Sequence, residues 1–280
     1  MFEPNCVVVL PFSEIAIKGV QVRSFIEKRL KKNMTDYFEH YKVPCEKIIH
    51  YSGRMIVQST EPKKVVEALR NCFGINLLFL AREERFGDLE ELATIGASLC
   101  KDSFKEGNFA VRGKSFSKGF SSKKLEETIG GKILDNAPNL KVKLKNPEKE
   151  FYCISFEKKA YFYFEPIKVA SGMPVGSQGR AALLVTTESK QKEVLLLGKH
   201  LLKMGCTIAI VTSEKELFFD SSSLEEFNCF KSIKVYSLAE AKELYQKQDI
   251  RAFFSSAVTL SQIKKDSRVV GFKVFAPLLF

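Results

Sequence analysis

The segment from residue 112 to residue 123 combines residue types that bind phosphate groups and nucleobases. Its cations are Arg112, Lys114, Lys118 and Lys123, and its rings are Phe116 and Phe120. A guanidinium can donate two parallel hydrogen bonds to one phosphate, and backbone N–H groups of the intervening glycine-rich turns can add to such contacts. An exposed aromatic ring can stack on an unpaired base, which contributes about 1–3 kcal/mol. The segment therefore predicts a binding site for a polyanion, with Arg112 as a bidentate phosphate contact.

The same residues also fit a plain structural role. Phe120 can belong to a hydrophobic core, and the lysines can form a solvated face that binds nothing. Three further cations, Lys18, Arg23 and Arg54, have less support from their neighbours, and we predict them as secondary contacts.

The charge of the chain favours a polyanionic partner. The 280 residues contain 44 Lys and Arg against 33 Asp and Glu, which gives a net charge of +11. Residues 100–146 contain eleven cations and five acids, so a sixth of the chain carries more than half of this excess. Excess positive charge attracts nucleic acids and anionic surfaces, and its concentration in one segment indicates where such a partner binds.

Other chemistries have little support in the sequence. The seven cysteines stand singly, without a Cys-x-x-Cys pair, and the three histidines show no ligand spacing, so we predict no metal site. Cys206 and Cys229 have no neighbouring activating group in the sequence, and we predict no catalytic residue. No apolar stretch approaches the roughly 20 residues that cross a bilayer, and no basic leader opens the chain. We therefore expect a cytoplasmic protein with free thiols and no membrane contact.

Three groups of elements are expected to position these residues. Residues 1–82 show the order β-α-β-α-β typical of a small ferredoxin-like domain, with a turn at Ser52-Gly53 splitting one strand. The expected elements are strands at 7–12, 47–59 and 75–81 and helices at 22–41 and 62–69.

Residues 83–168 predict a second α+β domain. Asp88 is expected to cap a helix that runs to about Phe104, and a strand at 108–112 leads into a loop at 113–122. Ser122 is then expected to cap a helix at 123–134, and strands at 151–156 and 160–164 form a hairpin through Lys158–Lys159.

Residues 169–280 predict a third, α/β domain. After a hinge-like stretch at 166–179, continuous apolar strands at 181–185, 207–212, 233–236, 252–255 and 269–275 alternate with helices at 193–204 and 238–246. Apolar strands separated by helices are typical of a doubly wound parallel sheet.

Three stretches in chain order resemble the 4-thiouridine synthetase (tRNA sulfurtransferase) family. Glu14–Gly19 and the basic helix after it resemble the start of the family's ferredoxin-like domain. Phe109–Lys114, followed by the Glu126–Gly130 helix and Lys141–Pro147, resembles its RNA-binding THUMP domain. Gly172–Gly179 resembles the hinge into its pyrophosphatase-loop domain, which is Rossmann-like. The resemblance implies that the first two domains bind tRNA together, and that the THUMP domain holds the acceptor end with its 3′ tail.

The resemblance breaks at the family's phosphate loop. In the family a Ser-Gly-Gly-x-Asp-Ser loop after the first strand of the third domain holds the pyrophosphate of ATP. Here Thr186, Thr187, Glu188, Ser189 and Lys190 stand in that place. A branched residue disfavours the backbone conformations that glycine allows, and a carboxylate stands where phosphate would bind. Thr186, Thr187, Ser189 and Lys190 therefore form a degenerate nucleotide-binding loop, in which only Ser189 and Lys190 could still meet a phosphate.

Two later stretches also depart from the family. Phe254–Leu260 resembles its Thr-Gly-Glu-Ser-Leu segment but lacks the glycine and the acid, and Phe275–Phe280 resembles its fifth strand. The family's sulfur-transferring cysteine belongs to a part that follows this strand, so we expect no such cysteine here.

We thus predict a tRNA-binding protein that acts in tRNA modification, needs no cofactor and has an eroded ATP loop. Its expected partner is tRNA. The resemblance also implies a homodimer and a sulfur-donor or modification protein as a further partner. One alternative is an active ATP-dependent tRNA sulfurtransferase with a divergent loop, ATP, magnesium and an external sulfur donor. Another is a basic structural protein that binds RNA without preference.

Overall fold

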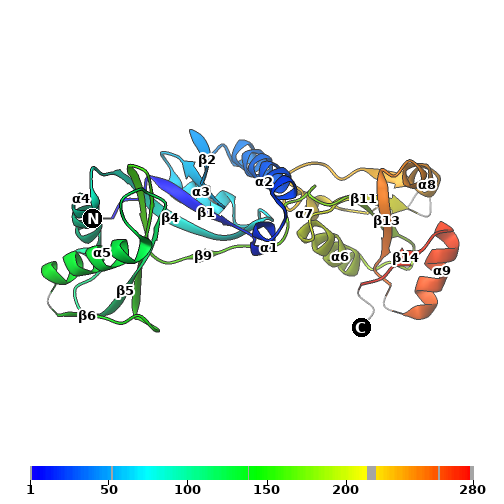
Figure 1. Cartoon of the computed structure of the whole chain (residues 1–280). Helices are drawn as coiled ribbons and strands as arrows, with labels where there is room; N and C mark the ends of the chain where they lie inside the picture. Colours follow the sequence, from blue (N-terminus) through cyan, green and yellow to red (C-terminus); the bar gives the residue numbers. More distant parts are fainter. Residues whose placement is uncertain (1, 52, 138, 213–218, 258, 278–280) are drawn as a thin grey trace. The chain divides into compact units, whose positions relative to one another are not determined.

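The protein was analysed as a computed structural model that describes residues 2–51, 53–137, 139–212, 219–257 and 259–277 (Figure 1). Contacts divide the chain into two compact units, each built from separated stretches. Unit 1 comprises Met1–Leu10, Val43–Glu67 and Leu77–Ile167, and unit 2 comprises Pro11–Lys42, Ala68–Asn76 and Lys168–Phe280.

The elements up to residue 168 belong mostly to unit 1. In chain order they are β1 Cys6–Pro11, α1 Ser13–Ala16, α2 Val20–Tyr41, β2 Lys47–Tyr51, β3 Arg54–Gln58, α3 Pro62–Ala68, β4 Ile75–Arg85, α4 Leu89–Cys100, β5 Gly107–Ser115, α5 Ser122–Asn136, β6 Leu140–Val142, β7 Lys149–Phe156, β8 Lys159–Tyr163 and β9 Ile167–Lys168. Of these, α1 and α2 belong to unit 2.

One sheet joins the strands of the two predicted N-terminal domains. Its order is β2-β3-β1-β4-β8-β7-β5-β6, with β9 paired to β4. The predicted splitting of one strand is confirmed, because β2 and β3 pair antiparallel and Gly53 between them has φ +77°. Ser52, the other half of the predicted turn, lies outside the described residues. The junction of the two domains is the antiparallel pair β4–β8, which runs from Ala81 opposite Tyr163 to Arg85 opposite Lys159.

Aromatic side chains fill the core beneath α4 and α5, which lie on the same part of the sheet (Figure 1). Phe109, Phe151 and Phe162 are completely buried there. The predicted cap of the first helix is confirmed, since Asp88 accepts a hydrogen bond from the N–H of Glu91. The helix ends at Cys100 rather than near Phe104. A turn follows it, and in this turn the N–H of Phe104 bonds to Cys100 O while its ring enters the core.

The structure corrects three predictions around the basic segment. Lys114 is a strand residue and not part of a loop, because β5 continues to Ser115 in parallel register with β7. The cap of α5 is Ser121, whose Oγ accepts from Lys124 N–H, since Ser122 Oγ already accepts from Ser115 N–H. Lys159 begins β8, so the hairpin turn is shorter than predicted.

Unit 2 contains the predicted doubly wound sheet. Its later elements are β10 Arg180–Val185, α6 Gln191–Lys203, β11 Thr207–Thr212, α7 Ser222–Glu225, β12 Val235–Ser237, α8 Leu238–Gln246, β13 Ile250–Ser255, α9 Leu260–Val270 and β14 Val274–Phe275. The strand order is β12-β11-β10-β13-β14, and all four pairings are parallel. Buried residues of α8 and α9 share a core with one face of the sheet, while Gly198 of α6 lies close to Leu183 and Ile208 of the other face. The predicted fold class is confirmed.

The predicted strand at 269–275 is wrong over its first half. Val269 and Val270 end the helix α9, and only Val274–Phe275 forms a strand. The helix has its own boundaries, because Thr259 caps its start and Gly271 ends it with φ +75°. Sequence reasoning also missed the short helices α1 and α7.

The long helix α2 is tied to the C-terminal part of unit 2. Tyr37 is completely buried, and its hydroxyl donates to Glu226 O at 2.6 Å and to Asn71 O at 2.9 Å. The ring of His40 stacks on Phe230 with 3.5 Å between ring centroids. These contacts join residues far apart in the sequence into one packed unit.

Candidate nucleic-acid interface

The guanidinium of Arg112 is held by two acceptors within unit 1. Its Nε and Nη2 both lie 2.8 Å from Glu150 Oε1, and Nη2 also donates to Leu144 O at 2.8 Å. Tyr152 donates to the other oxygen of Glu150 at 2.5 Å. A bidentate contact with phosphate would need Nη2, which already serves these neighbours. The predicted phosphate contact of Arg112 stays a prediction, and the described geometry gives its side chain a structural partner.

Two pKa shifts follow from this chain of hydrogen bonds. The hydrogen bond from Tyr152, followed by the one from Arg112, lowers the pKa of Glu150 despite partial burial. Burial, followed by the hydrogen bond with Glu150, raises the pKa of Tyr152 to about 12. Glu150 is therefore ionised and Tyr152 protonated at neutral pH, which keeps the Arg112 contact intact.

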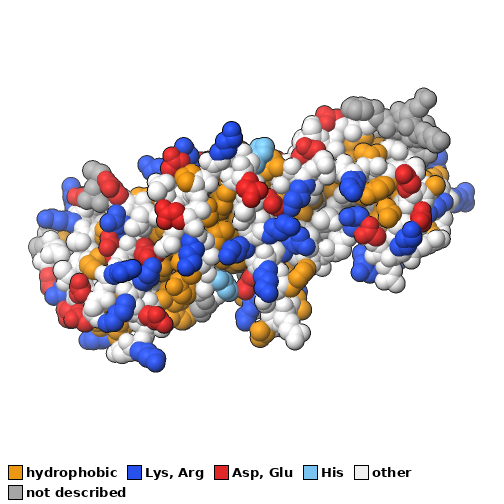
Figure 2. Space-filling view, turned by 90° about the horizontal axis from the view of Figure 1, so that it is seen from above, with side chains coloured by type: hydrophobic (Ala, Val, Ile, Leu, Met, Phe, Trp, Pro, Cys, Tyr) orange, Lys and Arg blue, Asp and Glu red, His pale blue; other side chains and the backbone are white. Residues whose placement is uncertain are grey.

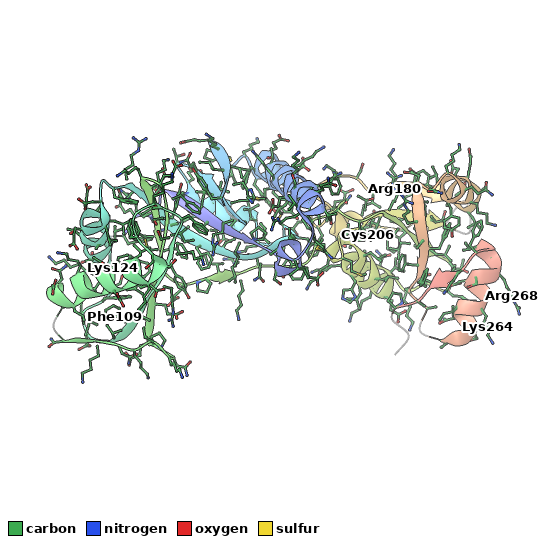
Figure 3. The ribbon with its side chains drawn as sticks, in the orientation of Figure 1. Phe109, Lys124, Arg180, Cys206, Lys264 and Arg268 are labelled. Atoms are coloured by element: carbon green, nitrogen blue, oxygen red, sulfur yellow. The ribbon has the colours of Figure 1, made fainter. Side chains whose placement is uncertain are left out.

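The predicted lysines, unlike Arg112, extend into solvent. Lys114, Lys118 and Lys123 are all exposed, and Lys123 forms only a long ion pair of 3.8 Å with Glu127. Lys124 projects from the same helix, α5, while Phe109 lies in the strand β5 (Figure 3). Exposed ammonium groups on long side chains are suited to phosphate contacts that do not depend on base sequence.

The two predicted rings differ in their surroundings. Phe120 is partly buried against the core beneath α4 and α5, with its ring centroid 6.2 Å from that of Phe86. Phe116 has 37% of its surface exposed and stacks on Phe156, with parallel rings 4.7 Å apart. The structural role weighed for Phe120 thus has direct support, and Phe116 is the ring available to a base.

The secondary contacts are divided between the two units. Lys18 and Arg23 belong to unit 2, at the start of α2, while Arg54 lies in β3 of unit 1. Arg54 is half-buried and forms a hydrogen bond with Tyr163. Their RNA contacts stay predictions.

Exposed cations that sequence reasoning did not single out lie at the edge of the sheet. Lys141, Lys143 and Lys145 are exposed along β6 and the stretch after it, where Val142 and Leu144 are also exposed. Their signals in the sequence were the charge excess of residues 100–146, the alternation of lysine with apolar residues, and the resemblance of Lys141–Pro147 to the THUMP domain. On the face shown in Figure 2, cations alternate with acids and hydrophobic side chains, so no single block of charge dominates it.

The degenerate loop after β10 is closed by its own hydrogen bonds. The N–H of Thr186 donates to Ser189 Oγ, and the N–H of Ser189 donates to Thr186 O, each at 3.0 Å. Lys190 pairs with Glu193 at 3.3 Å, and Lys265 of α9 pairs with Glu188. The polar groups left over from the family pattern thus already have partners within the chain.

A small hollow lies beside this loop. Its volume is only about 20 Å³, whereas ligand pockets usually measure about 300–1,000 Å³. Glu188, Glu193 and Asp266 line it, and Lys and Arg are absent from its described lining. Carboxylates repel a triphosphate at short range. Thr187, also in the loop, is exposed to solvent.

Burial raises the pKa of six of the seven cysteines. None of the seven described cysteines forms a disulfide bond, and five of them are buried. Burial raises the pKa of Cys229 to about 12 and also raises that of Cys206, which lies between α6 and β11 (Figure 3). A thiol with a raised pKa is rarely ionised and reacts slowly.

The described residues offer neither a candidate metal cluster nor a helix that could span a bilayer. They contain no group of three or more His, Cys, Asp or Glu side chains placed to hold a metal ion. Among the helices of the described part, none is both long and apolar enough to span a bilayer.

Family comparisons identify both domains of the first half of the chain. Residues 7–78 match the ThiI ferredoxin-like domain, and residues 86–165 match the THUMP domain. A probable tRNA sulfurtransferase of Methanosarcina acetivorans is 26% identical over 91% of this chain and 63% of its own length. One from Bacillus velezensis is 29% identical over 86% of this chain and 62% of its own length. The chain thus spans just under two thirds of these relatives.

Solved structures share the fold. A crystal structure of a protein from Pyrococcus horikoshii Ot3 aligns with a TM-score of 0.80 and 24% identity, covering 98% of this chain and 94% of that chain. The crystal structure of a 4-thiouridine synthetase–RNA complex with bound ATP aligns with a TM-score of 0.71 and 18% identity, covering 99% of this chain and 81% of that chain.

Proposed function

Because the chain belongs to the 4-thiouridine synthetase (tRNA sulfurtransferase) family, we propose that it binds tRNA and acts in tRNA modification. In this proposal the ferredoxin-like and THUMP domains hold the acceptor end of the tRNA. The C-terminal α/β domain binds no ATP and forms no thiolated product alone. The protein therefore supports a modification step together with a partner protein that supplies the chemistry.

The observation that carries the tRNA-binding part is the set of exposed lysines on a THUMP domain. Lys114, Lys118 and Lys123 extend into solvent from β5, the loop after it and the start of α5. Phosphate contacts of this kind set affinity and salt dependence without fixing a base sequence. Shape and unpaired nucleotides then provide the preference for tRNA.

The closed loop after β10 supports the proposal that this chain does not bind ATP. Thr186 and Ser189 bond to each other, Lys190 bonds to Glu193, and the adjoining hollow is lined by carboxylates. A triphosphate would have to break these contacts and displace Glu188 from Lys265. We therefore propose that neither ATP nor magnesium is a cofactor of this chain.

The test combines binding and catalysis in one reaction. Unmodified tRNA, ATP, magnesium and sulfide are incubated with the protein, and both tRNA binding and 4-thiouridine are measured. We expect tRNA binding that weakens with salt, no thiolated product, and no shift in melting temperature at saturating ATP-magnesium. A related active enzyme under the same conditions is the control for the assay. Equal affinity for tRNA and for random duplex RNA would refute the tRNA preference.

A second candidate function is an active ATP-dependent tRNA sulfurtransferase with an external sulfur donor. It is favoured by the start of α6, where no side chain caps the helix at the carboxyl end of β10. Free N–H groups at a helix start can bind phosphate. Thiolated product in the assay above, together with a higher melting temperature in ATP-magnesium, would establish this function and refute the ATP-free proposal.

A further inference from the structure

An apolar groove on unit 2 lies between α1 and α6 (Figure 1). Its volume is about 520 Å³. The apolar side chains that line it are Phe12, Met173, Leu197, Leu201, Met204 and Pro277. Leu197 and Leu201 are buried, whereas Met204 is 61% exposed. We propose that this α1–α6 groove is the docking site of a partner protein, which inserts the apolar face of a helix with acidic flanks.

Large apolar side chains near the groove are also uncovered. Ile17 and Val20 stand on either side of the lining residue Lys18 in the chain, and they are 80% and 74% exposed. Groups of exposed apolar side chains with a polar rim are typical of surfaces that bind another protein. A small molecule confined to the groove would leave Ile17 and Val20 in water, so a protein partner fits this surface better.

The lining of the groove favours a helical partner. Four lining residues along α6 and its C-cap have the spacing i, i+3, i+4 and i+7, namely Leu197, His200, Leu201 and Met204. This row is about 10 Å long and lies on one face of the helix. A second helix can pack its own i, i+3, i+4 and i+7 side chains against such a row. None of the described lining residues belongs to a strand, so the groove offers no strand edge to which an extended peptide could bond.

The charged side chains of the groove favour acidic flanks on that helix. Lys18 and Lys203 are exposed, and neither forms an ion pair with a described residue. His200 is exposed in the same lining, and Glu14 is its only acid among the described residues. Cations around an apolar surface attract a partner whose carboxylates surround an apolar face, and this complementarity selects the partner. A basic helix with the same apolar face would be repelled.

One wall of the groove is formed before a partner arrives. The N–H of Met173 donates to Lys203 O at 2.8 Å, which holds this wall against the end of α6. Gly172 has φ +95°, and a Cβ atom there would lie 2.5 Å from the same oxygen, so the close approach requires glycine. Met173 also packs with Ile15 of α1. A wall that is already in place loses little conformational freedom when it binds.

This inference rests on the proposed function, because it describes the kind of partner protein that the function requires. The full chain is titrated by fluorescence anisotropy with three labelled peptides of about 18 residues, which is long enough to form a helix. The first has a leucine face surrounded by glutamates, the second has the same face surrounded by lysines, and the third has the glutamates with alanines in place of the leucines.

Two variants change the groove, and each has a matched control on α6 outside the lining. Met204→Gln removes an exposed apolar side chain at nearly constant size, and Leu196→Gln is its control. Lys203→Glu reverses a charge of the lining, and Lys192→Glu is its control. All four side chains are exposed, and melting curves check that each variant is folded.

We expect the wild type to bind the acidic leucine peptide at least about ten-fold more tightly than the other two peptides. Met204→Gln should weaken binding of this peptide at least about ten-fold, because the burial of an apolar side chain is lost. Lys203→Glu should weaken the acidic peptide about five-fold and strengthen the basic peptide by a similar factor. Leu196→Gln and Lys192→Glu should bind all three peptides as the wild type does.

Equal binding of the acidic and basic leucine peptides, or binding of none of the three, would refute the docking site. Two further measurements test other occupants, namely titration with the dye anilinonaphthalene sulfonate and sedimentation of the protein alone. Dye that Met204→Gln does not bind and that the acidic peptide does not displace would make the groove a small-molecule pocket instead. Self-association that Met204→Gln abolishes would make the occupant a second copy of the chain. The same proteins are titrated with tRNA, and a wild type that does not bind tRNA would refute the proposed function, whereas the peptides alone decide the groove.

Discussion

Replacing Lys114, Lys118 and Lys123 together by glutamine is expected to flatten the salt dependence of tRNA binding. Each side chain is exposed and free to reach a phosphate, apart from the long pair between Lys123 and Glu127. One phosphate contact adds about 0.9 to the slope of log K against log salt, so three add about 2.7. Between about 50 and 200 mM salt, the triple variant should therefore lose about 40-fold less affinity than the wild type.

Arg112→Gln is the matched comparison, because the guanidinium of Arg112 is already bonded to Glu150 and Leu144 O. We expect the salt slope of this variant to differ from that of the wild type by less than about 0.45, which is half the value for one phosphate contact. Labelled tRNA is titrated by fluorescence anisotropy at several salt concentrations, and circular dichroism checks that each variant is folded. If the triple variant has the same slope as the wild type, the three lysines are not phosphate contacts. If Arg112→Gln lowers the slope by about 0.9, the value for one phosphate contact, Glu150 must release the guanidinium to RNA.

Three further predictions concern stability and reactivity. Phe109→Ala should lower the free energy of unfolding by about 3–5 kcal/mol in urea titrations, because the ring is completely buried; a loss below about 1 kcal/mol would contradict this packing. Cys229, with a pKa of about 12, should react with iodoacetamide at pH 8 far more slowly in the folded than in the urea-unfolded protein; equal rates by mass spectrometry would disprove its burial. Because folding lowers the pKa of Glu150, its carboxylate stabilises the fold above the unfolded pKa of about 4.3, and this stabilisation disappears as the pH falls through the folded pKa. Glu150→Gln should therefore cost up to about 1 kcal/mol at pH 7 and progressively less as the pH falls below the unfolded pKa, and a pH-independent difference in thermal melts would contradict the shift.

The parallel sheet of unit 2 was predictable because its strands are continuous apolar runs with helices between them. The helix α9 was not, because the segment from Val269 to Phe275 has the composition of a strand. The helix α9 depends on the cap at Thr259 and on the packing of Val270 in the core of the sheet. Boundaries of this kind are decided by packing rather than by local propensity.

The candidate site shows the same limit more clearly. Sequence reasoning grouped Arg112 with the lysines of the same segment, but the acid that holds Arg112 is set by the register of β5 on β7. A stack of three rings joins Tyr51, Phe116 and Phe156 from different strands and loops. No local pattern predicts which aromatic residues meet across a sheet, so the sequence could name Phe120 as a possible core residue but not the partner of Phe116.

The bond between Tyr37 and Glu226 has a consequence for how the protein is made. The two residues are 189 positions apart, and at about 5–20 residues per second the ribosome needs about 10–40 s to pass from one to the other. During that time α2 lacks the partners that Tyr37 and His40 contact in the finished fold. The nascent helix must keep this face from wrong partners, so a stalled or shortened translation product would expose an aromatic surface that chaperones and proteases recognise.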